Sequence, residues 1–323
     1  MTFMRGRAWP LVLTLWTQVG TGCGEIEKVV GVSYDDRFAA TAADVYLPAP
    51  ASEAPPGGWP AVLAIHGGGW RHFDRSSMAA ASERLAGAGY VVMNIDYRLV
   101  PAGQYPAAVQ DSLCALAYLR ANAAEWGVDP ERIATYGYSA GGHLASMVGV
   151  ATAGTMHQPD CEAAVAGGGG GGGGGGVRIA PPAAVVSGAG PEDMWLFPEA
   201  EAVVDFVGGK KAEVPELWDA ASPITYVDAA AEAAAAGGGA LPPFLFVHGE
   251  EDWFAGIEHS EHMRDALEAV GGQAELFSIP GGGHLINRDT AAGRYDLIVT
   301  STDTAESWIA MVDFLDRTIG GAR

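Results

Sequence analysis

The segment Gly137–Gly141, which reads Gly-Tyr-Ser-Ala-Gly, constrains the fold of this chain more than any other feature. It follows the apolar stretch Arg132–Tyr136, which is typical of a buried strand, and precedes a helix-like stretch from His143. A serine with glycines two residues before and after it can occupy a sharp strand-to-helix turn, because the missing side chains relieve crowding there. Such a turn presents the hydroxyl at a sheet edge, at the N-terminus of a helix. This geometry contributes little to packing but suits nucleophilic attack, so we predict that Ser139 is a nucleophile.

A second glycine-rich segment, His66–Trp70, follows the strand-like run Trp59–Ile65. Consecutive glycines let the backbone approach a bound carbonyl, so the N–H groups of Gly68 and Gly69 can point at the negative oxygen that nucleophilic attack creates. The N–H of Ala140 would complete this oxyanion hole. A plain turn or a phosphate-binding loop is the alternative. Against the latter, no Lys-Ser/Thr pair follows the glycines, and no G-x-G-x-x-G helix start is present.

A serine nucleophile needs a base, and the base needs a carboxylate that orients it. The strand predicted over Leu241–Val247 is followed closely by Asp252, and the strand predicted over Ala274–Ile279 is followed by a glycine loop that ends at His284. Both side chains therefore come after the C-terminal ends of late strands, on the sheet edge where ligands bind in open α/β sheets. Asp252 would fix the tautomer of the imidazole, whose other nitrogen takes the serine proton.

Other residues compete for these roles. Glu250 and Glu251 are rivals of Asp252 for the carboxylate. His66 precedes the glycine-rich segment, and a hydrogen bond that braces this loop suits it better than catalysis. The remaining histidines do not end a glycine-rich loop after a late strand, so we expect surface or hydrogen-bonded structural roles for His72, His143, His157, His248, His259 and His262.

The order of apolar and amphipathic stretches predicts an α/β fold. Short apolar runs typical of strands buried on both faces alternate with helical patterns, which favours a mostly parallel sheet covered by helices on both faces. The predicted strands include Val91–Ile95, Arg132–Tyr136, Ala183–Val186 and Leu245–Val247, and the predicted helices are Ala107–Ala123, Glu258–Val270 and a closing Asp303–Ile319. Because 49% of the 323 residues are hydrophobic, residues 24–323 can bury one large core, and we expect them to form a single domain.

Residues 1–23 are predicted to be an export signal. Two arginines precede the short apolar run Ala8–Trp16, and small residues lead to Cys23. The apolar run is too short to span a bilayer as a stable helix. Cys23 after small residues resembles a bacterial lipoprotein cleavage site, although Gly20 stands where that pattern usually has leucine. We therefore expect a periplasmic or extracellular protein, with Cys23 as a candidate for lipid attachment.

Two further features concern structure more than chemistry. In an oxidising compartment Cys114 and Cys161 could form a disulfide, and two unpaired buried thiols are the alternative. The ten-glycine run Gly167–Gly176 cannot pack or hold one conformation, so it is expected to be a flexible surface loop. An inert insertion is the favoured interpretation of this run over a lid.

These segments together resemble the α/β-hydrolases of the group related to hormone-sensitive lipase and the bacterial feruloyl-esterase-like carboxylesterases. The likeness runs from about Val29 to Arg317. The matching segments, in family order, are His66–Trp70, Asp96–Leu99, Tyr105–Ala108, Trp126–Ile133, Gly137–Gly142, Ala221–Tyr226, His248–Asp252 and Gly281–His284. The chain departs from the lipase-like members at Leu99–Ala102, where they read Leu-Ala-Pro-Glu, and at the glycine run.

The resemblance implies an α/β-hydrolase fold that works without a metal or another cofactor. It implies that Ser139 is the nucleophile, His284 the base and Asp252 the acid, with the oxyanion donors predicted above.

By the same resemblance, the region around Trp195 caps the substrate pocket. Trp253 follows Asp252, while Trp70 and Tyr138 belong to the two glycine-rich segments. These four aromatic residues are candidates for lining an apolar or aromatic pocket, although core filling is the default role for each.

The charge of the chain restricts its partners. With 39 acidic and 18 basic residues and a net charge of −21, it should be repelled by nucleic acids and anionic lipids. Two function classes remain. The first is a serine hydrolase that acts through an acyl-enzyme on small acyl or aryl esters, or on aryl formamides with the same three residues. The second is a non-catalytic binding module on a hydrolase scaffold, but the complete set of residues argues against it. A peptidase is less favoured, because the chain has no room for the additional domain that peptidases of this fold usually carry.

Overall fold

A computed structural model of the chain describes residues 26–49, 54–150, 157, 159, 161, 179–237, 240–284, 287–289, 294–296 and 306–320. The predicted export signal at residues 1–23, with Cys23, lies outside the described residues, and so does the glycine run at 167–176.

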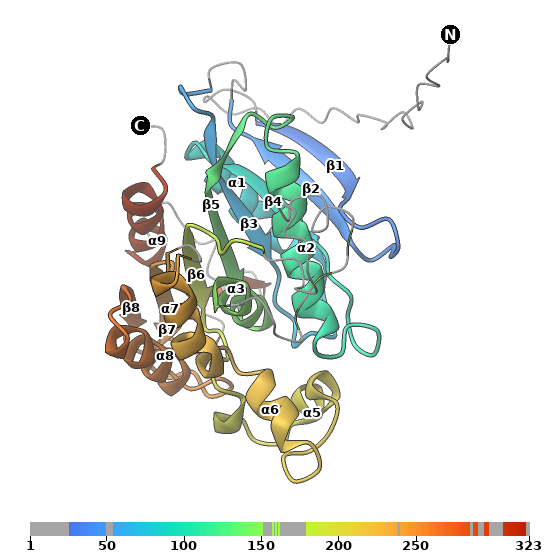
Figure 1. The fold of residues 1–323 in the computed structure, drawn as a ribbon, viewed down its shortest axis with the longest axis vertical. Coiled ribbons are helices and arrows are strands. Elements are labelled where there is room, and N and C mark those ends of the chain that lie inside the picture. The colour runs from blue at the N-terminus through green and yellow to red at the C-terminus, as the bar shows by residue number, and fades with distance from the viewer. Residues whose placement is uncertain are drawn as a thin grey trace.

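In the described part, eight strands form one sheet in the order β1-β2-β4-β3-β5-β6-β7-β8 (Figure 1). The pairs β1–β2 and β2–β4 are antiparallel, and every later pair is parallel. The strands are β1 Glu27–Ser33, β2 Ala42–Leu47, β3 Trp59–Ile65, β4 Val91–Ile95, β5 Val128–Tyr138, β6 Ala184–Gly188, β7 Phe244–Gly249 and β8 Ala274–Ile279. Two short strands, β9 Asn287–Asp289 and β10 Arg294–Asp296, form a separate pair. The predicted mostly parallel sheet is thus confirmed.

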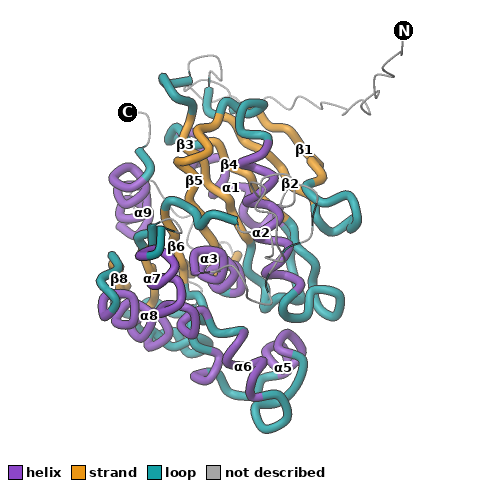
Figure 2. The backbone as a smooth tube through the Cα atoms, viewed as in Figure 1, coloured by secondary structure: helices purple, strands orange, loops and turns teal. Residues whose placement is uncertain are grey.

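Helices cover both faces of this sheet (Figure 2). They are α1 Ala79–Gly87, α2 Ala107–Ala121, α3 Ala140–Val150, α5 Glu201–Val207, α6 Pro215–Ala220, α7 Val227–Ala235, α8 Glu258–Ala269 and α9 Glu306–Thr318. Short 3-10 helices lie at η2 Arg75–Met78, η3 Met194–Leu196 and η4 Pro223–Tyr226. Within the described ranges, no helix combines the length and the apolar character needed to cross a bilayer.

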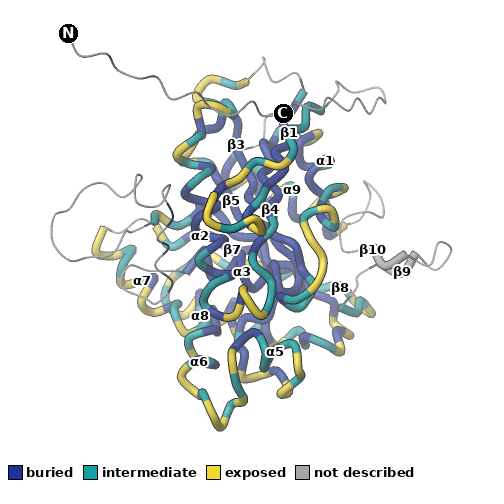
Figure 3. Tube along the Cα trace, turned by 90° about the vertical axis from the view of Figure 1, so that its right-hand side faces the viewer, coloured by how far each residue is buried: buried dark blue, intermediate teal, exposed yellow. Residues whose placement is uncertain are grey.

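Successive residues of each strand pack on opposite sides of the sheet, as the pleat requires. Leu63 of β3 belongs to the core beneath α2 and α3, whereas its neighbours Val62 and Ala64 belong to the core beneath α1 and α9. Both layers are apolar, which explains why β3 and β4 are buried along their whole length (Figure 3). The sheet therefore provides a rigid frame whose C-terminal strand ends carry the residues predicted to be functional.

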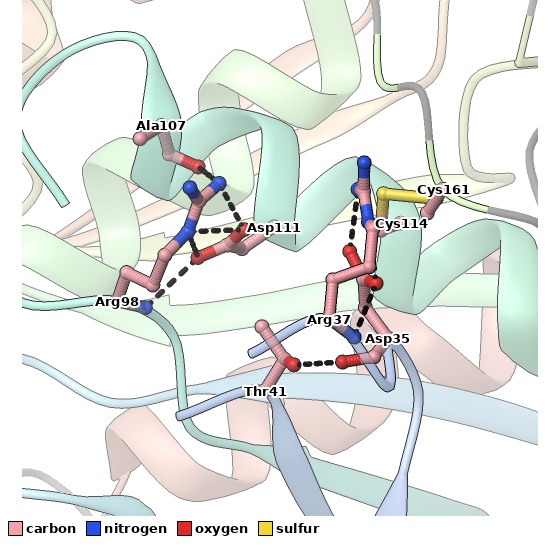
Figure 4. Close-up of a disulfide and its surroundings, with 8 residues drawn as sticks. All are labelled: Asp35, Arg37, Thr41, Arg98, Ala107, Asp111, Cys114 and Cys161. Carbon is pink, nitrogen blue, oxygen red and sulfur yellow. Dashed lines mark hydrogen bonds and ion pairs between the residues drawn. A yellow bond between two sulfur atoms is a disulfide. The ribbon is translucent and has the colours of Figure 1, made fainter. Parts of the chain in front are cut away.

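A disulfide joins Cys114 of α2 to Cys161, with their Cα atoms 6.1 Å apart (Figure 4). This answers the question that the sequence left open in favour of a bonded pair. On the same helix, Asp111 accepts hydrogen bonds from the backbone and guanidinium of Arg98, which fixes the loop after β4 to α2. The disulfide ties α2 to a segment 47 residues away, and the Arg98 contact ties it to the loop that precedes it.

Candidate active site

Ser139 lies at the turn between β5 and α3 and has a positive φ of 55°. A side chain on Gly137 would overlap the carbonyl oxygen of Gly141, and a side chain on Gly141 would overlap that of Ile65. Both glycines are therefore required by the close approach of backbone on either side of the turn. The Ser139 N–H donates to the carbonyl of Gly188 at 2.7 Å, which anchors the strained residue to β6.

The structure brings together the three side chains that the sequence proposes for proton transfer. The Ser139 Oγ lies 2.9 Å from the His284 Nε2, and the His284 Nδ1 lies 2.7 Å from the Asp252 Oδ2. Asp252 and His284 follow the C-terminal ends of β7 and β8, on the edge where β5 ends at the serine. An imidazole held in this way can accept the hydroxyl proton at Nε2 while it donates Nδ1–H to the carboxylate.

The surroundings of Asp252 keep its carboxylate ionised. Its Oδ1 accepts the N–H groups of Phe254 and Ala255, each at 2.9 Å, and the His248 Nε2 lies 3.3 Å from its Oδ2. Burial alone would raise the pKa of Asp252, but the hydrogen bonds from His248 and His284 lower this pKa well below its ordinary value. A permanent negative charge at this point stabilises the imidazolium that forms during proton transfer.

His248 is a supporting residue whose role the sequence analysis missed. It is the fifth residue of β7 and is fully buried. Its Nε2 also lies 2.7 Å from the Ala255 carbonyl, so this nitrogen carries the proton, and its Nδ1 lies 2.7 Å from the Ser260 hydroxyl. Its position four residues before Asp252 is visible in the sequence, but its contact with the carboxylate depends on how the intervening turn folds back.

The other candidates for the carboxylate and the base make different contacts. Glu250 accepts a hydrogen bond from the Ser278 hydroxyl at 2.9 Å, and Glu251 is exposed. His66 is buried, with its Nδ1 2.7 Å from the Gly67 carbonyl and its ring stacked on Tyr97 at a centroid distance of 4.4 Å. Burial lowers the pKa of His66, so the ring is neutral. These contacts fit the loop-bracing role expected for it.

The glycine-rich loop lies directly against the nucleophile turn. A Cβ on Gly67 would stand 2.7 Å from the Tyr138 carbonyl oxygen and 3.3 Å from the Ser139 Cβ. Gly68 and Gly69 have positive φ angles of 111° and 58°. The Ala140 N–H is the first of α3, where an N–H has no acceptor within the helix. This proximity makes the three N–H groups suitable donors to an oxyanion next to Ser139, and that role stays a prediction.

A pair of glycine-to-alanine substitutions tests the loop. In Gly68→Ala the new methyl would overlap the His72 carbonyl oxygen, so the loop and its N–H groups must move. In Gly69→Ala the methyl meets only the Ala202 Cβ, at 3.7 Å, and the main cost is the left-handed backbone, about 1–2 kcal/mol. We expect Gly68→Ala to lower kcat/KM for p-nitrophenyl acetate by ~10²-fold or more, as loss of an oxyanion donor does. Gly69→Ala should have the smaller effect. Wild-type kcat/KM in Gly68→Ala would contradict the oxyanion assignment.

The aromatic residues proposed for a pocket fall into two groups. Trp70 is 1% exposed and stacks on Phe206 at 4.3 Å, with its Nε1–H donated to the His143 Nδ1 at 3.2 Å. Tyr138 is also buried, with its ring 5.6 Å from that of His284. For Trp70 this packing fits core filling, the default role.

The two other candidates reach the surface. Trp195 is 40% exposed and donates its Nε1–H to Asp219 at 2.6 Å. Trp253 is 84% exposed and packs edge-on against Phe254, whose ring in turn lies 5.0 Å from the His284 ring. One aromatic ring, that of Phe254, thus separates Trp253 from the proposed base, and Trp253 lies at the margin of the site.

Comparisons with known proteins place the chain among esterase-like sequences. A family model described as BD-FAE matches residues 43–267, a range that contains Ser139 and Asp252. Esterase LipC of Mycobacterium tuberculosis is 32% identical over 232 residues, which are 70% of this chain and 52% of LipC. Carboxylesterase NlhH of the same organism is 43% identical over 91 residues, 28% of each protein. The chain thus spans about half of the length of LipC and a smaller share of NlhH.

One solved structure is similar over nearly its whole length. It is described as a truncated form of a carbohydrate esterase from gut microbiota. It is 26% identical, covers 90% of this chain and 96% of its own, and superposes with a TM-score of 0.67.

Proposed function

The chain belongs to the BD-FAE family, which confirms the resemblance predicted from its sequence, and from this premise we propose that it is a serine carboxylic-ester hydrolase. The observation that carries the proposal is the hydrogen-bonded series from the Ser139 Oγ through His284 to the ionised Asp252. The esterase and carboxylesterase relatives support the same reaction class.

The proposed reaction has two halves. The Ser139 Oγ attacks the ester carbonyl carbon while the His284 Nε2 takes the hydroxyl proton, and the resulting oxyanion accepts hydrogen bonds from the N–H groups of Gly68, Gly69 and Ala140. Collapse of this intermediate breaks the bond to the alcohol oxygen, which receives the proton from His284. A water molecule then attacks the acyl carbon and gives a proton to His284. His284 passes this proton to the Ser139 Oγ as the bond to the acyl group breaks and the carboxylic acid leaves.

The proposed substrate is an ester of a small acyl or aryl acid. The alcohol side is proposed to be a carbohydrate, because the similar solved structure reported above is described as a carbohydrate esterase and Trp253 offers an exposed aromatic face at the site margin. Phe254, packed against the His284 ring, provides an apolar wall near the reacting atoms. Nucleic acid is an unsuitable partner for a chain with a net charge of −21.

A substrate series tests this proposal. The purified protein would be assayed on p-nitrophenyl esters from acetate to dodecanoate, with methyl ferulate, an acetylated xylo-oligosaccharide and N-formylkynurenine alongside. We expect the highest kcat/KM among the short acyl esters or the aryl and carbohydrate esters. Turnover of N-formylkynurenine alone would show that the protein is an arylformamidase that uses the same three residues, rather than an esterase. No turnover of any substrate would favour a binding module.

We also propose that the protein is exported, with residues 1–23 as the signal and Cys23 as the candidate for lipid attachment. The disulfide between Cys114 and Cys161 supports this location, because such bonds persist in oxidising compartments. The mass of the mature N-terminal peptide from a bacterial expression host would decide the matter. A peptide that begins at Met1 would contradict export, and an unmodified Cys23 would contradict lipidation.

A further inference from the structure

Glu192 is a fully buried carboxyl group that the proposed reaction does not use. It lies in the loop after β6, and its Oε1 accepts two hydroxyl groups: that of Ser187 at 2.6 Å and that of Ser146 at 3.0 Å. Its backbone carbonyl accepts the N–H of Ile224 in η4 at 3.1 Å. Glu192 therefore connects three segments that are distant in the sequence.

Two of these segments hold the nucleophile. Ser187 is followed by Gly188, the residue whose carbonyl accepts the Ser139 N–H at 2.7 Å. Ser146 lies on α3, which begins directly after Ser139. The carboxyl group thus links the end of β6, which anchors the strained serine from one side, to the helix that continues from the serine on the other.

The neighbouring glycines make room for this link. A Cβ on Gly142, in the first turn of α3, would stand 2.8 Å from the Ser187 Oγ. A Cβ on Gly190 would overlap the Ser187 Oγ and stand 2.7 Å from the Glu192 Oε1. Because backbone approaches so closely here, a movement of the carboxyl cluster would be passed to the first turn of α3 and so to Ser139.

The surroundings of Glu192 favour its neutral form. Among the described residues its Oε2 has no hydrogen-bond partner, and burial raises its pKa to about 8. The ionisable side chains on the elements around it are His143 of α3, Tyr226 of η4, Asp193 next to it and His259 of α8, whose Nδ1 accepts the Asp193 N–H. Burial lowers the pKa of both histidines to about 3 and raises that of Tyr226, so these three groups are neutral at pH 5 to 9.

We propose that Glu192 is a positioning residue for the nucleophile, which fastens the end of β6 to α3 through Ser187 and Ser146 and so keeps Ser139 aligned with His284. The inference rests on the proposed function. The Oε1 of Glu192 acts as a carbonyl oxygen with two lone pairs, one for each serine hydroxyl, and the proton resides on Oε2. An amide side chain can reproduce this pattern, whereas an apolar side chain of similar size cannot.

Glu192→Gln and Glu192→Leu form the matched pair that tests this inference. Because a small misplacement of reacting groups can cost ~10²-fold, we expect Glu192→Leu to lower kcat on p-nitrophenyl acetate by roughly 10–100-fold with KM little changed. Glu192→Gln should keep kcat within about threefold of the wild type. Wild-type kcat in Glu192→Leu, or an equal loss in both variants, would overturn the inference. Should Glu192→Leu fail to fold, Ser146→Ala with Ser187→Ala replaces it and is expected to show the same loss of kcat. Wild-type kcat in that double variant overturns the inference as well.

A second measurement reports the protonation state of Glu192 independently of activity. The pKa of this group is raised in the folded protein, whereas in the unfolded chain it lies near 4.5. Its stabilising contribution is therefore complete below pH 4.5 and is lost as the pH rises toward 8. The melting temperature of the wild type should fall relative to that of Glu192→Gln between pH 5 and 8. A melting-temperature difference between the two proteins that does not change with pH would overturn the assignment of a neutral carboxyl group to Glu192. An inactive wild type that still shows this shift would refute the proposed function alone.

Discussion

Replacement of Ser139 by alanine is expected to abolish covalent labelling by a fluorophosphonate probe and to lower the turnover of p-nitrophenyl acetate by ~10⁴-fold or more. The probe forms its bond with an activated serine oxygen, and Ser139 is the serine whose Oγ lies 2.9 Å from the His284 Nε2. Alanine removes that oxygen but keeps the Cβ and the backbone N–H that donates to Gly188. The variant should therefore fold with the oxyanion loop in place, and any residual rate would come from that loop.

The matched control is Ser82→Ala. Ser82 is also a buried serine, but it lies on α1 and donates its hydroxyl to the Met78 carbonyl at 2.8 Å. This variant should label at the wild-type rate. Probe labelling that persists in Ser139→Ala would refute the assignment of the nucleophile, because another serine would then carry the reaction.

The strands that the sequence predicted well are those with an unambiguous pattern. β3, β4 and β8 match their predicted ranges because each is a run of mostly apolar residues bounded by turn-forming residues. β7 begins at Phe244 rather than at Leu241, since the two intervening prolines lack the N–H that a strand needs. β1 carries charged and half-exposed residues at the sheet edge, so its sequence lacks a buried-strand pattern. The antiparallel edge of the sheet was therefore not predicted.

The residues of the site also divide into those that could be predicted from the sequence and those that could not. Ser139, Asp252 and His284 could be predicted because each follows a recognisable strand and has a residue type suited to proton transfer. The roles of His248 and Glu192 could not be predicted, because buried polar side chains are defined by the partners that packing brings to them. Trp70 differs from these two, because core filling was its default role and its burial agrees with it. It adjoins the glycine-rich loop in the sequence, yet its ring stacks on Phe206 inside the core.

Asp252→Asn should lower kcat by ~10⁴-fold while the protein stays folded. The reason lies in how the carboxylate is held. Its Oδ1 accepts two backbone N–H groups, so the oxygen of an asparagine must occupy that position. The NH₂ group is then forced to the Oδ2 position, where it faces the His284 Nδ1 at hydrogen-bond distance. Because this NH₂ can only donate, Nδ1 must lose its proton, which moves to Nε2, and Nε2 can no longer accept the proton of Ser139.

Two matched variants and a pH series complete the test. Glu250→Gln and Glu251→Gln make the same chemical change next to Asp252 and should retain wild-type kcat, because neither side chain contacts the imidazole in the described structure. The pKa of Asp252 is lowered in the folded protein, so its stabilising contribution is present above the unfolded value of 3.8 and is lost as the pH falls further. The stability difference between wild type and Asp252→Asn should therefore shrink below pH 4. Near-normal turnover in Asp252→Asn would transfer the orienting role to one of the two glutamates, and the glutamine variant that lost activity would identify which one.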